Sequence, residues 1–191
     1  MRVITGLAKG KRLKTLEGID VRPTIDRIKE AIFSAIHFDL PGKTFLDLFS
    51  GSGQMGIEAI SRGTKKAIFV DKSKNSIDVV HENLVSTGLL GRSDIFNMDA
   101  QSFIKSYNGN VDFVFLDPPY KTGIIRPILK EVSSIVSKDG MIICENPFDE
   151  ELPEQVGDFY INKSTKYGKI KITFYKGCEI TDENSSLSGE L

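Results

Sequence analysis

The chain has 191 residues, of which 25 are Lys or Arg and 26 are Asp or Glu, so its formal net charge at neutral pH is −1. This balance excludes a uniformly basic nucleic-acid coat protein and an acidic disordered chain. Hydrophobic residues make up 40% of the chain, and no apolar run approaches the roughly 20 residues of a membrane span. Because the first residues also lack the apolar stretch of a signal peptide, we expect a cytoplasmic protein without a membrane partner.

Metal-binding and disulfide-rich classes are excluded by the few cysteines and histidines. The chain has two of each, and Cys144 and Cys178 lie 34 positions apart. No zinc-ligand spacing can be assembled from these residues. We therefore expect no metal site.

Positive charge gathers near both ends of the chain. Residues 1–14 carry five basic residues and no acid, and residues 161–177 do the same, whereas residues 145–158 carry six acids and no Lys or Arg. Basic patches can attract phosphates although the whole chain is nearly neutral. The alternative is that the lysines are solvated side chains that protect sheet edges.

The first 42 residues predict an extension made of a short hairpin and one helix. Residues 2–5 and 12–16 are separated by a turn at Gly10, and apolar residues at helical spacing predict a helix over 24–38 that begins just after Pro23.

Strands and helices then alternate over residues 43–177. The predicted strands are 44–48, 67–70, 94–97, 112–116 and 141–144, and the predicted helices are 54–61, 74–86, 100–107 and 124–136. A closing hairpin over 159–164 and 170–175 follows. Short apolar strands separated by helices predict an α/β fold: a seven-stranded, mostly parallel sheet with helices on both faces, the Rossmann-like layout of class I methyltransferases. Residues 178–191 are polar and predict a disordered tail.

A glycine-rich loop follows the first strand of this sheet. Gly51, Gly53 and Gly56 open a helix directly after Asp47, and Asp71 ends the next strand, 20 residues beyond Gly51. Such glycines allow a sharp turn and close approach of a ligand with a nucleoside body. The pattern alone fits both NAD and S-adenosylmethionine.

The acid before the glycines favours S-adenosylmethionine. Asp47 would repel a pyrophosphate at the helix N-terminus but would attract the ammonium group of the methionyl part. Asp99, after the third strand, is placed to accept from an adenine amino group, and a helix N-cap explains it equally well.

The fourth strand runs into Asp117, Pro118, Pro119 and Tyr120. The prolines stiffen the loop at the carboxyl edge of the sheet, beside the expected cofactor. An exocyclic amine of a base is a weak nucleophile because its lone pair is delocalised into the ring. Asp117 and the Pro118 carbonyl could accept hydrogen bonds from its two N–H groups, while Tyr120 could stack on the base. The alternative is a rigid proline turn with an Asp cap.

Several segments together resemble the RsmD family, the bacterial guanine-N2 methyltransferases of small-subunit rRNA. The resemblance covers residues 1 to about 177 and rests on the opening 2–6 with Lys9 and Gly10, on 22–24 followed by Arg27 and Glu30, on the block 47–63, and on 117–120. Thr5 and Gln54 depart from the common pattern, since a second Gly and a small residue are usual there.

The resemblance implies transfer of a methyl group from S-adenosylmethionine to N2 of one guanine in 16S rRNA, within the small ribosomal subunit or its assembly intermediate, by a monomer. Catalytic residues are expected at Asp117, Pro118 and Tyr120. The expected cofactor-binding residues are Asp47, Phe49, Gly51, Gly53, Asp71, Asp99 and Ala100. The expected RNA-binding residues are Arg2, Lys9, Lys11, Arg12, Arg22, Arg27, Lys166 and Lys169.

Three other functions are compatible with parts of the sequence. A DNA adenine-N6 methyltransferase would share the Asp-Pro-Pro-Tyr motif, but the chain leaves little room for a target-recognition region. A nicotinamide oxidoreductase would share the glycine loop, but no His or Tyr–Lys pair for hydride transfer is evident. A silent RNA-binding scaffold would be expected to have lost Asp117 or the glycines.

Overall fold

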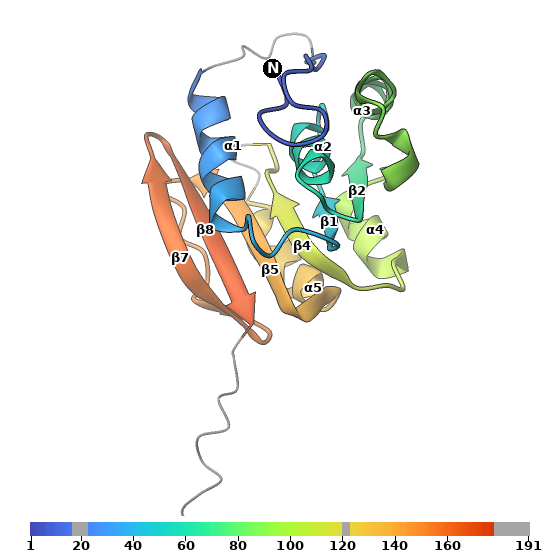
Figure 1. Ribbon diagram of the computed structural model, residues 1–191. Coiled ribbons are helices and arrows are strands. Elements are labelled where there is room, and N and C mark those ends of the chain that lie inside the picture. The colour runs from blue at the N-terminus through green and yellow to red at the C-terminus, as the bar shows by residue number, and fades with distance from the viewer. Residues whose placement is uncertain (17–22, 120–122, 178–191) are drawn as a thin grey trace, which may run out of the picture.

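The computed structural model describes residues 1–16, 23–119 and 123–177, and its strands form a single eight-stranded sheet (Figure 1). The strand order is β3-β2-β1-β4-β5-β8-β7-β6. The elements in chain order are α1 (Pro23–Ala35), β1 (Thr44–Asp47), α2 (Gln54–Ser61), β2 (Lys66–Asp71), α3 (Lys74–Thr87), the short 3-10 helix η1 (Leu90–Arg92), β3 (Ser93–Asn97), α4 (Ala100–Ser106), β4 (Val111–Leu116), α5 (Ile125–Ser133), β5 (Val136–Pro147), β6 (Gln155–Val156), β7 (Phe159–Tyr167) and β8 (Ile170–Gly177).

The direction of the strands decides which loops meet. β1 to β5 run parallel, β8 is antiparallel to β5, and β7 is antiparallel to β8. β7 therefore points the same way as β4 and β5, and the turn after β7 lies at the edge of the sheet where the parallel strands end. The predicted class is confirmed, but the predicted count of seven strands is wrong. The missed strand, β6, has two residues, which is too short to leave an alternating pattern in the sequence.

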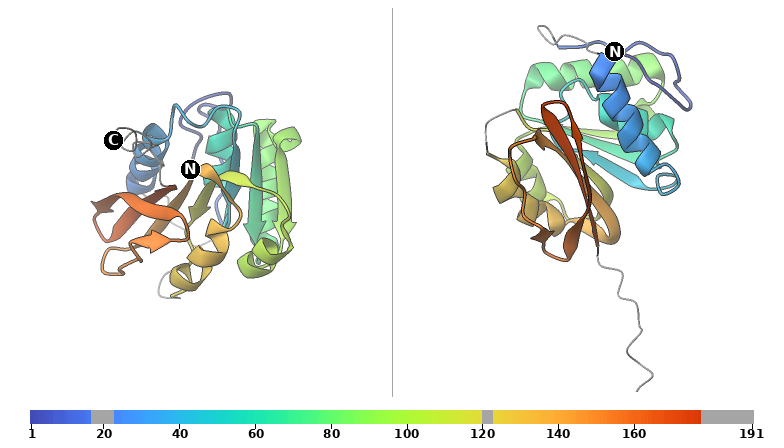
Figure 2. Two further views of the ribbon diagram at one scale, coloured as in Figure 1. Left: turned by 90° about the horizontal axis from the view of Figure 1, so that it is seen from below. Right: turned by 90° about the vertical axis from the view of Figure 1, so that its left-hand side faces the viewer.

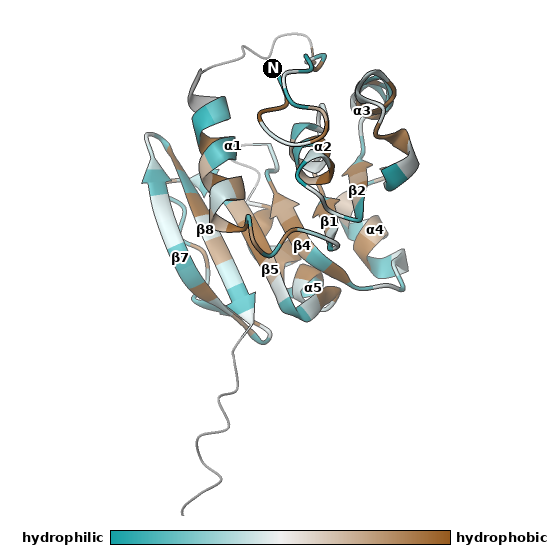
Figure 3. Ribbon diagram, in the orientation of Figure 1, coloured by the Kyte–Doolittle hydropathy of each residue, from teal (hydrophilic) through white to brown (hydrophobic). Residues whose placement is uncertain are grey.

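Each face of the sheet has its own hydrophobic core. Residues 1–16, α1, α2 and α3 pack on one face, against alternate strand residues such as Phe45, Phe69 and Phe113. α4 and α5 pack on the other face, against the intervening residues such as Leu46 and Val114. Figure 2 shows helices on both sides of the sheet, and Figure 3 shows the apolar centre of the sheet beside the more polar β7. The central strands are thus buried on both faces, as parallel strands require.

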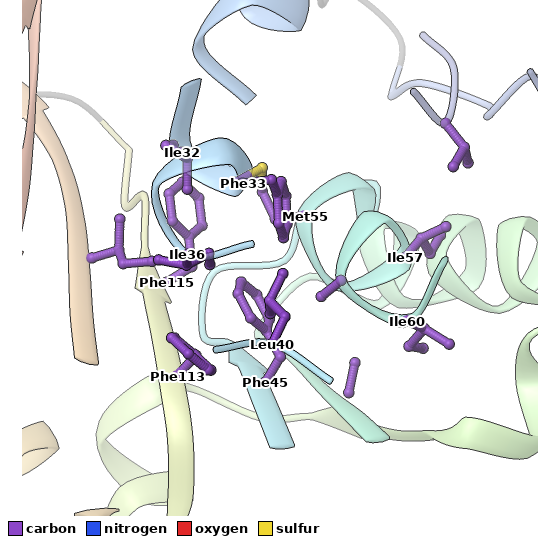
Figure 4. Close-up of a cluster of buried hydrophobic side chains, with 14 of the residues drawn as sticks. Ile32, Phe33, Ile36, Leu40, Phe45, Met55, Ile57, Ile60, Phe113 and Phe115 are labelled. Atoms are coloured by element: carbon purple, nitrogen blue, oxygen red, sulfur yellow. The ribbon is translucent and has the colours of Figure 1, made fainter. Parts of the chain in front are cut away.

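α1 covers the part of the sheet that α2 and α3 leave open. Its side chains Ile32 and Phe33, and Ile36 directly after it, are fully buried and share a cluster with the aromatic rings of β1 and β4 (Figure 4). The Phe33 ring stacks on Phe45 at a centroid distance of 5.9 Å. The helix predicted over 24–38 thus exists, ends three residues earlier, and belongs to the core of the sheet.

The N-terminal segment is a paired loop in place of the two predicted hairpin strands. A single antiparallel bridge joins Arg2 and Arg12, and the Val3 and Lys11 backbones are hydrogen-bonded. The segment is fastened mainly to α2, because the Leu7 N–H donates to the Ser61 carbonyl and the Ala8 N–H to Ser61 Oγ. Contacts with α2 satisfy the backbone groups that a second strand would otherwise have paired.

The boundary between α5 and β5 also differs from the prediction. The expected helix over 124–136 ends at Ser133, and Val136 already pairs with Val111 on β4. The register shifts before Met141 pairs with Phe113, so residues 137–140 form a bulge. Their polar sequence, which ends in Gly140, is typical of a turn, and this hid the first part of the strand. None of the helices in the described part of the chain is long and apolar enough to span a membrane.

Candidate functional site

A pocket of about 870 Å³ opens at the edge where the parallel strands end. Its walls come from the segments that follow β1, β2, β3 and β4 and from Glu145 near the end of β5, and it is closed on one side by Ile28, Lys29 and Ile32 of α1. The carboxyl edge of a parallel sheet is where α/β proteins bind their ligands. The volume is in the upper part of the usual range for small-molecule sites, so a cofactor and part of a second reactant can both fit.

The glycine loop forms one wall of this pocket. Gly51 and Gly53 have φ angles of 51° and 77°, a conformation that side chains other than glycine adopt only with strain. Gly56 is needed for a different reason, because a Cβ atom there would lie 2.3 Å from the Phe69 ring. The first two glycines shape the turn, and the third allows α2 to pack on β2.

Two carboxylates hold the backbone of this loop. Asp47 Oδ2 accepts a hydrogen bond of 3.0 Å from the Gly56 N–H, and Asp71 Oδ2 accepts one of 2.9 Å from the Gly51 N–H. Asp71 lines the pocket, whereas Asp47 is 2% exposed and lies beneath the loop. Burial raises the pKa of Asp47 to about 7, and the negative charge of Asp71 adds to this effect.

The segment after β3 also lines the pocket. Asp99 and Ala100 line the pocket, as does Phe49 of the glycine loop. Asp99 Oδ1 accepts a hydrogen bond of 2.9 Å from the Ser102 N–H, which caps α4. Hydrogen bonds from Ser102 lower the pKa of Asp99, so this carboxylate stays charged at the rim. The helix-cap explanation of Asp99 is thereby confirmed, and the adenine contact stays a prediction.

The predicted catalytic residues follow β4. Asp117 and Pro118 line the pocket floor, and Tyr120 lies outside the described residues. Burial raises the pKa of Asp117 well above its usual range, and the charges of Glu145 and Asp47 raise it further.

The polar groups of the pocket suit a cationic ligand better than an anionic one. Its charged lining residues are four acids and two lysines: Lys29, Asp71, Lys72, Asp99, Asp117 and Glu145. In addition, Ser50 Oγ and Gln54 Oε1 are buried at the glycine loop without a hydrogen-bond partner. Buried polar groups of this kind are ordinarily hydrogen-bonded, so a ligand or water bound in the pocket would be expected to pair with them. S-adenosylmethionine carries an ammonium and a sulfonium charge and no phosphate, so the residues fit it, whereas the pyrophosphate of NAD would meet an acidic surface.

The predicted RNA-binding residues that the structure describes lie on the N-terminal loop, α1 and the closing hairpin. Arg2, Lys9, Lys11 and Arg12 are exposed on the N-terminal loop, whose Met1 lines the pocket. Lys11 Nζ donates to the Ser86 and Thr87 carbonyls, so this lysine also caps α3.

The remaining basic residues of the prediction are on α1 and the closing hairpin. Arg27 is exposed on α1, and Lys166 and Lys169 are exposed at the turn after β7, on the same edge of the sheet as Asp117. Lys166 Nζ lies 3.8 Å from the centre of the Phe148 ring. Arg22 lies outside the described residues.

Four residues of the site were missed in the sequence. They are Lys29, Ser50, Gln54 and Glu145, all of which line the pocket. Glu145 could have been found, because it directly follows the predicted strand 141–144 at its carboxyl end. Lys29 could not, since nothing in the sequence indicates that α1 lies against this edge of the sheet.

Comparison with known proteins gives the family. The family described as Conserved hypothetical protein 95 matches residues 1–176. The chain is 37% identical over 185 residues to "Putative rRNA methyltransferase YlbH" of Bacillus subtilis, covering 92% of this chain and 98% of that one. The chain belongs to this family, the RsmD methyltransferases.

Two further RsmD-like proteins extend the comparison. "Ribosomal RNA small subunit methyltransferase D" of Escherichia coli is 25% identical over 178 residues, covering 92% of this chain and 89% of its own length. The solved structure titled "Putative methyltransferase yhhF from Escherichia coli" matches with a TM-score of 0.84 and 24% identity, covering 93% of this chain and 97% of that one. The fold expected from the sequence is thus that of a methyltransferase over nearly the whole chain.

Proposed function

We propose that this chain transfers a methyl group from S-adenosylmethionine to the N2 amine of a guanine in 16S rRNA. The observation that carries the proposal is the acidic pocket in which Asp117 and Pro118, after β4, and the glycine loop, after the neighbouring β1, lie together at the carboxyl edge of the sheet. The relatives named as rRNA methyltransferases support RNA as the substrate. The choice of guanine N2 rests on the resemblance of residues 1–30 and 47–63 to the RsmD pattern.

The cofactor would be held by the glycine loop and the acids around it. We assign its methionyl part to the loop from Phe49 to Gly53 above Asp47, its ribose to Asp71, and its adenine to Asp99 and Ala100. When bound, S-adenosylmethionine supplies an electrophilic methyl group on a positively charged sulfur. The unpartnered Ser50 Oγ and Gln54 Oε1 would then find donors or solvent fixed by the ligand.

Asp117 and the backbone carbonyl of Pro118 would orient the amine. Each would accept a hydrogen bond from one N–H group of the amine, and together they would turn the nitrogen lone pair toward the methyl group. The main contribution of the enzyme to a methyl transfer is to hold the two reactants in this geometry. The amine is the nucleophile and the methyl group of the cofactor is the electrophile, so neither has to be generated by the enzyme. Pro118 is buried and its ring fixes the backbone that carries this carbonyl.

The basic residues would bind the RNA backbone. Arg2, Lys9 and Arg12 lie on the N-terminal loop, Arg27 on α1, and Lys166 and Lys169 at the turn after β7. Phosphates bound by these residues would hold the guanine at the pocket, since phosphate contacts set position and do not read sequence.

Methyl transfer to defined substrates tests the proposal. Labelled S-adenosylmethionine is incubated with unmodified small ribosomal subunits, with naked 16S rRNA and with duplex DNA, and the products are digested and analysed by nucleoside mass spectrometry. We expect N2-methylguanosine in RNA, and the sample that carries it shows whether ribosomal proteins are needed. N6-methyladenine in DNA, or no label in any sample, would refute the assignment.

A further inference from the structure

An exposed phenylalanine, Phe148, lies at the end of β5, close to the pocket. It follows Pro147, the last residue of the strand, and stands three residues beyond Glu145, which lines the pocket. At about 3.3 Å per residue this is roughly 10 Å along the chain. The side chain is 46% exposed. A single exposed apolar residue is common at a protein surface, so the surroundings of this ring decide what it can do.

Hydrogen bonds hold the turn that carries the ring. The buried Asn146 donates through Nδ2 to the Pro147 and Glu150 carbonyls, at 2.9 Å each. The Glu150 N–H donates to the Pro147 carbonyl, and the Phe148 N–H donates to the Lys169 carbonyl, both at 3.1 Å. The backbone under the ring is therefore fixed before any ligand binds, which reduces the ordering cost of binding.

The same turn is attached to a helix that borders the pocket. Arg126 Nε on α5 donates to the Glu151 carbonyl at 3.0 Å. The next two residues of α5, Pro127 and Ile128, line the pocket. The turn with the exposed ring and the wall of the pocket are thus joined directly.

Positive charge accompanies the ring on the side of the closing hairpin. Lys166 Nζ lies over the ring, 3.8 Å from its centre, and Lys169 is exposed on the same hairpin, in which residues 161–177 contain no acid. Asp149 and Glu151, in the turn itself, are exposed and negative. Phosphates would therefore bind on the hairpin side of the ring. An aromatic ring next to lysines is the combination with which proteins bind single-stranded nucleic acids, because bases stack on the ring and phosphates meet the cations.

We propose that Phe148 stacks on an unpaired RNA base near the target guanine, while Lys166 and Lys169 hold the adjoining phosphates. The inference rests on the proposed function and adds a residue that positions the substrate. RNA is recognised mainly at unpaired bases, which stack on aromatic side chains. Every base has an aromatic face, so this stack fixes the course of the strand and does not read its sequence.

Binding of a labelled single-stranded RNA of about 12 nucleotides, followed by fluorescence anisotropy, tests the stack without cofactor or methyl transfer. Phe148→Ala should weaken binding about 5- to 100-fold, the range for one lost stack, and should leave the salt dependence unchanged, because no phosphate contact is lost. Both proteins should bind an abasic strand of the same length equally, since that strand has no base to stack.

Two further variants and a control separate aromatic stacking from apolar contact. Phe148→Tyr should bind the intact strand as the wild type does, whereas Phe148→Leu should bind it as weakly as Phe148→Ala, although leucine keeps an apolar side chain. Phe38→Ala is the matched control and should bind normally. Phe38 is 92% exposed and precedes β1, at the opposite edge of the sheet.

Methyl transfer to unmodified small ribosomal subunits gives the second readout. Phe148→Ala should raise KM for the subunits and leave kcat nearly unchanged, because the stack is made before and during the reaction alike. Cofactor affinity, measured by calorimetry, and the midpoint of thermal unfolding should match the wild type. Phe38→Ala should change none of these quantities.

The outcomes separate the two proposals. The inference is overturned if the wild type does not bind the oligonucleotide, if Phe148→Leu binds it normally, or if Phe148→Ala loses equal affinity for the intact and abasic strands. A higher KM for subunits without weaker oligonucleotide binding would assign the ring to a contact with a ribosomal protein and would also overturn it. If the wild type labels no RNA, the proposed function fails, and the oligonucleotide measurement still decides whether Phe148 stacks on a base.

Discussion

Glu58 is the residue whose loss should destabilise the chain most, because four groups from three segments converge on its carboxylate. It is fully buried on α2. Its oxygens accept hydrogen bonds from the Ile4 N–H at 2.8 Å, the Thr5 N–H at 3.0 Å and Arg62 Nε at 2.8 Å. Lys29 Nζ of α1 lies 3.5 Å away and is itself 1% exposed.

The expected effect of Glu58→Ala follows from the buried groups that lose their hydrogen-bond and ion-pair partner. The substitution strands a buried lysine and two backbone N–H groups, and burial already lowers the pKa of Lys29. Removing one partner of a buried ion pair costs about 3–5 kcal/mol. A domain of this kind has a total stability of roughly 5–15 kcal/mol, so the loss is a large fraction of it. Lys29→Met should cost less, because Glu58 keeps Arg62 and both amides.

Urea denaturation followed by circular dichroism measures these differences as shifts of the midpoint at constant slope. Glu82→Ala is the control, since Glu82 pairs with Lys14 on the surface and such pairs are worth less than about 1 kcal/mol. If Glu58→Ala is no less stable than Glu82→Ala, or if Lys29→Met is the more damaging of the two core variants, the convergence of contacts on Glu58 does not stabilise the fold.

Three further predictions concern the pocket and the surface around it. Burial raises the pKa of Asp47 from 3.8 to about 7, so the stability that its protonated form contributes is lost as pH rises from about 4 to about 7. Over this window Asp47→Asn should therefore become more stable than the wild type, by up to about 4 kcal/mol in thermal or urea unfolding. The same variant should bind S-adenosylmethionine more weakly in calorimetry. Asp117→Ala should lower methyl transfer by about 10²-fold or more and leave the dissociation constant of the cofactor nearly unchanged, and loss of cofactor binding in this variant would show that Asp117 has a different role. Replacing Lys166 and Lys169 by Glu should weaken binding of 16S rRNA and reduce its salt dependence by roughly one phosphate contact per lysine, whereas the exposed Lys105→Glu on α4 should have no effect in the same filter-binding assay.

The parallel part of the fold could be predicted from the sequence because the local pattern of each segment there agrees with how the segment is buried in the folded chain. β4 is apolar in every buried position and β1 in every one but Asp47, and the helices between the strands carry amphipathic patterns, so these elements and their order along the chain were predicted correctly. The prediction failed where the local pattern of a segment does not indicate its place in the fold. The start of β5 has a polar bulge that resembles a turn, and the N-terminal loop obtains its hydrogen bonds from α2, which no local pattern can indicate.

The same distinction applies to the pocket. Asp71 and Asp117 directly follow predicted strands and Asp99 comes two residues after one, and the structure brings all three to one pocket. Lys29 was not predicted, because its position depends on how α1 packs across the sheet, and such packing is decided by the fit of Ile32 and Ile36 to the rings of β1 and β4.

The acids that are close together at the pocket lower the free energy of unfolding, and contacts elsewhere in the fold must offset this loss. Burial raises the pKa of Asp47 and Asp117, so the ionised form of each would be more stable in water, yet the parallel register of β1 and β4 holds them close together. This is the pattern expected where carboxylates are retained to bind a cation or accept a proton, because selection for stability alone would replace them. The buried Glu58 differs, since its charge is matched by two cations and two backbone amides. Glu58 on α2 therefore stabilises the fold, whereas the acids at the carboxyl ends of β1 and β4 lower its stability.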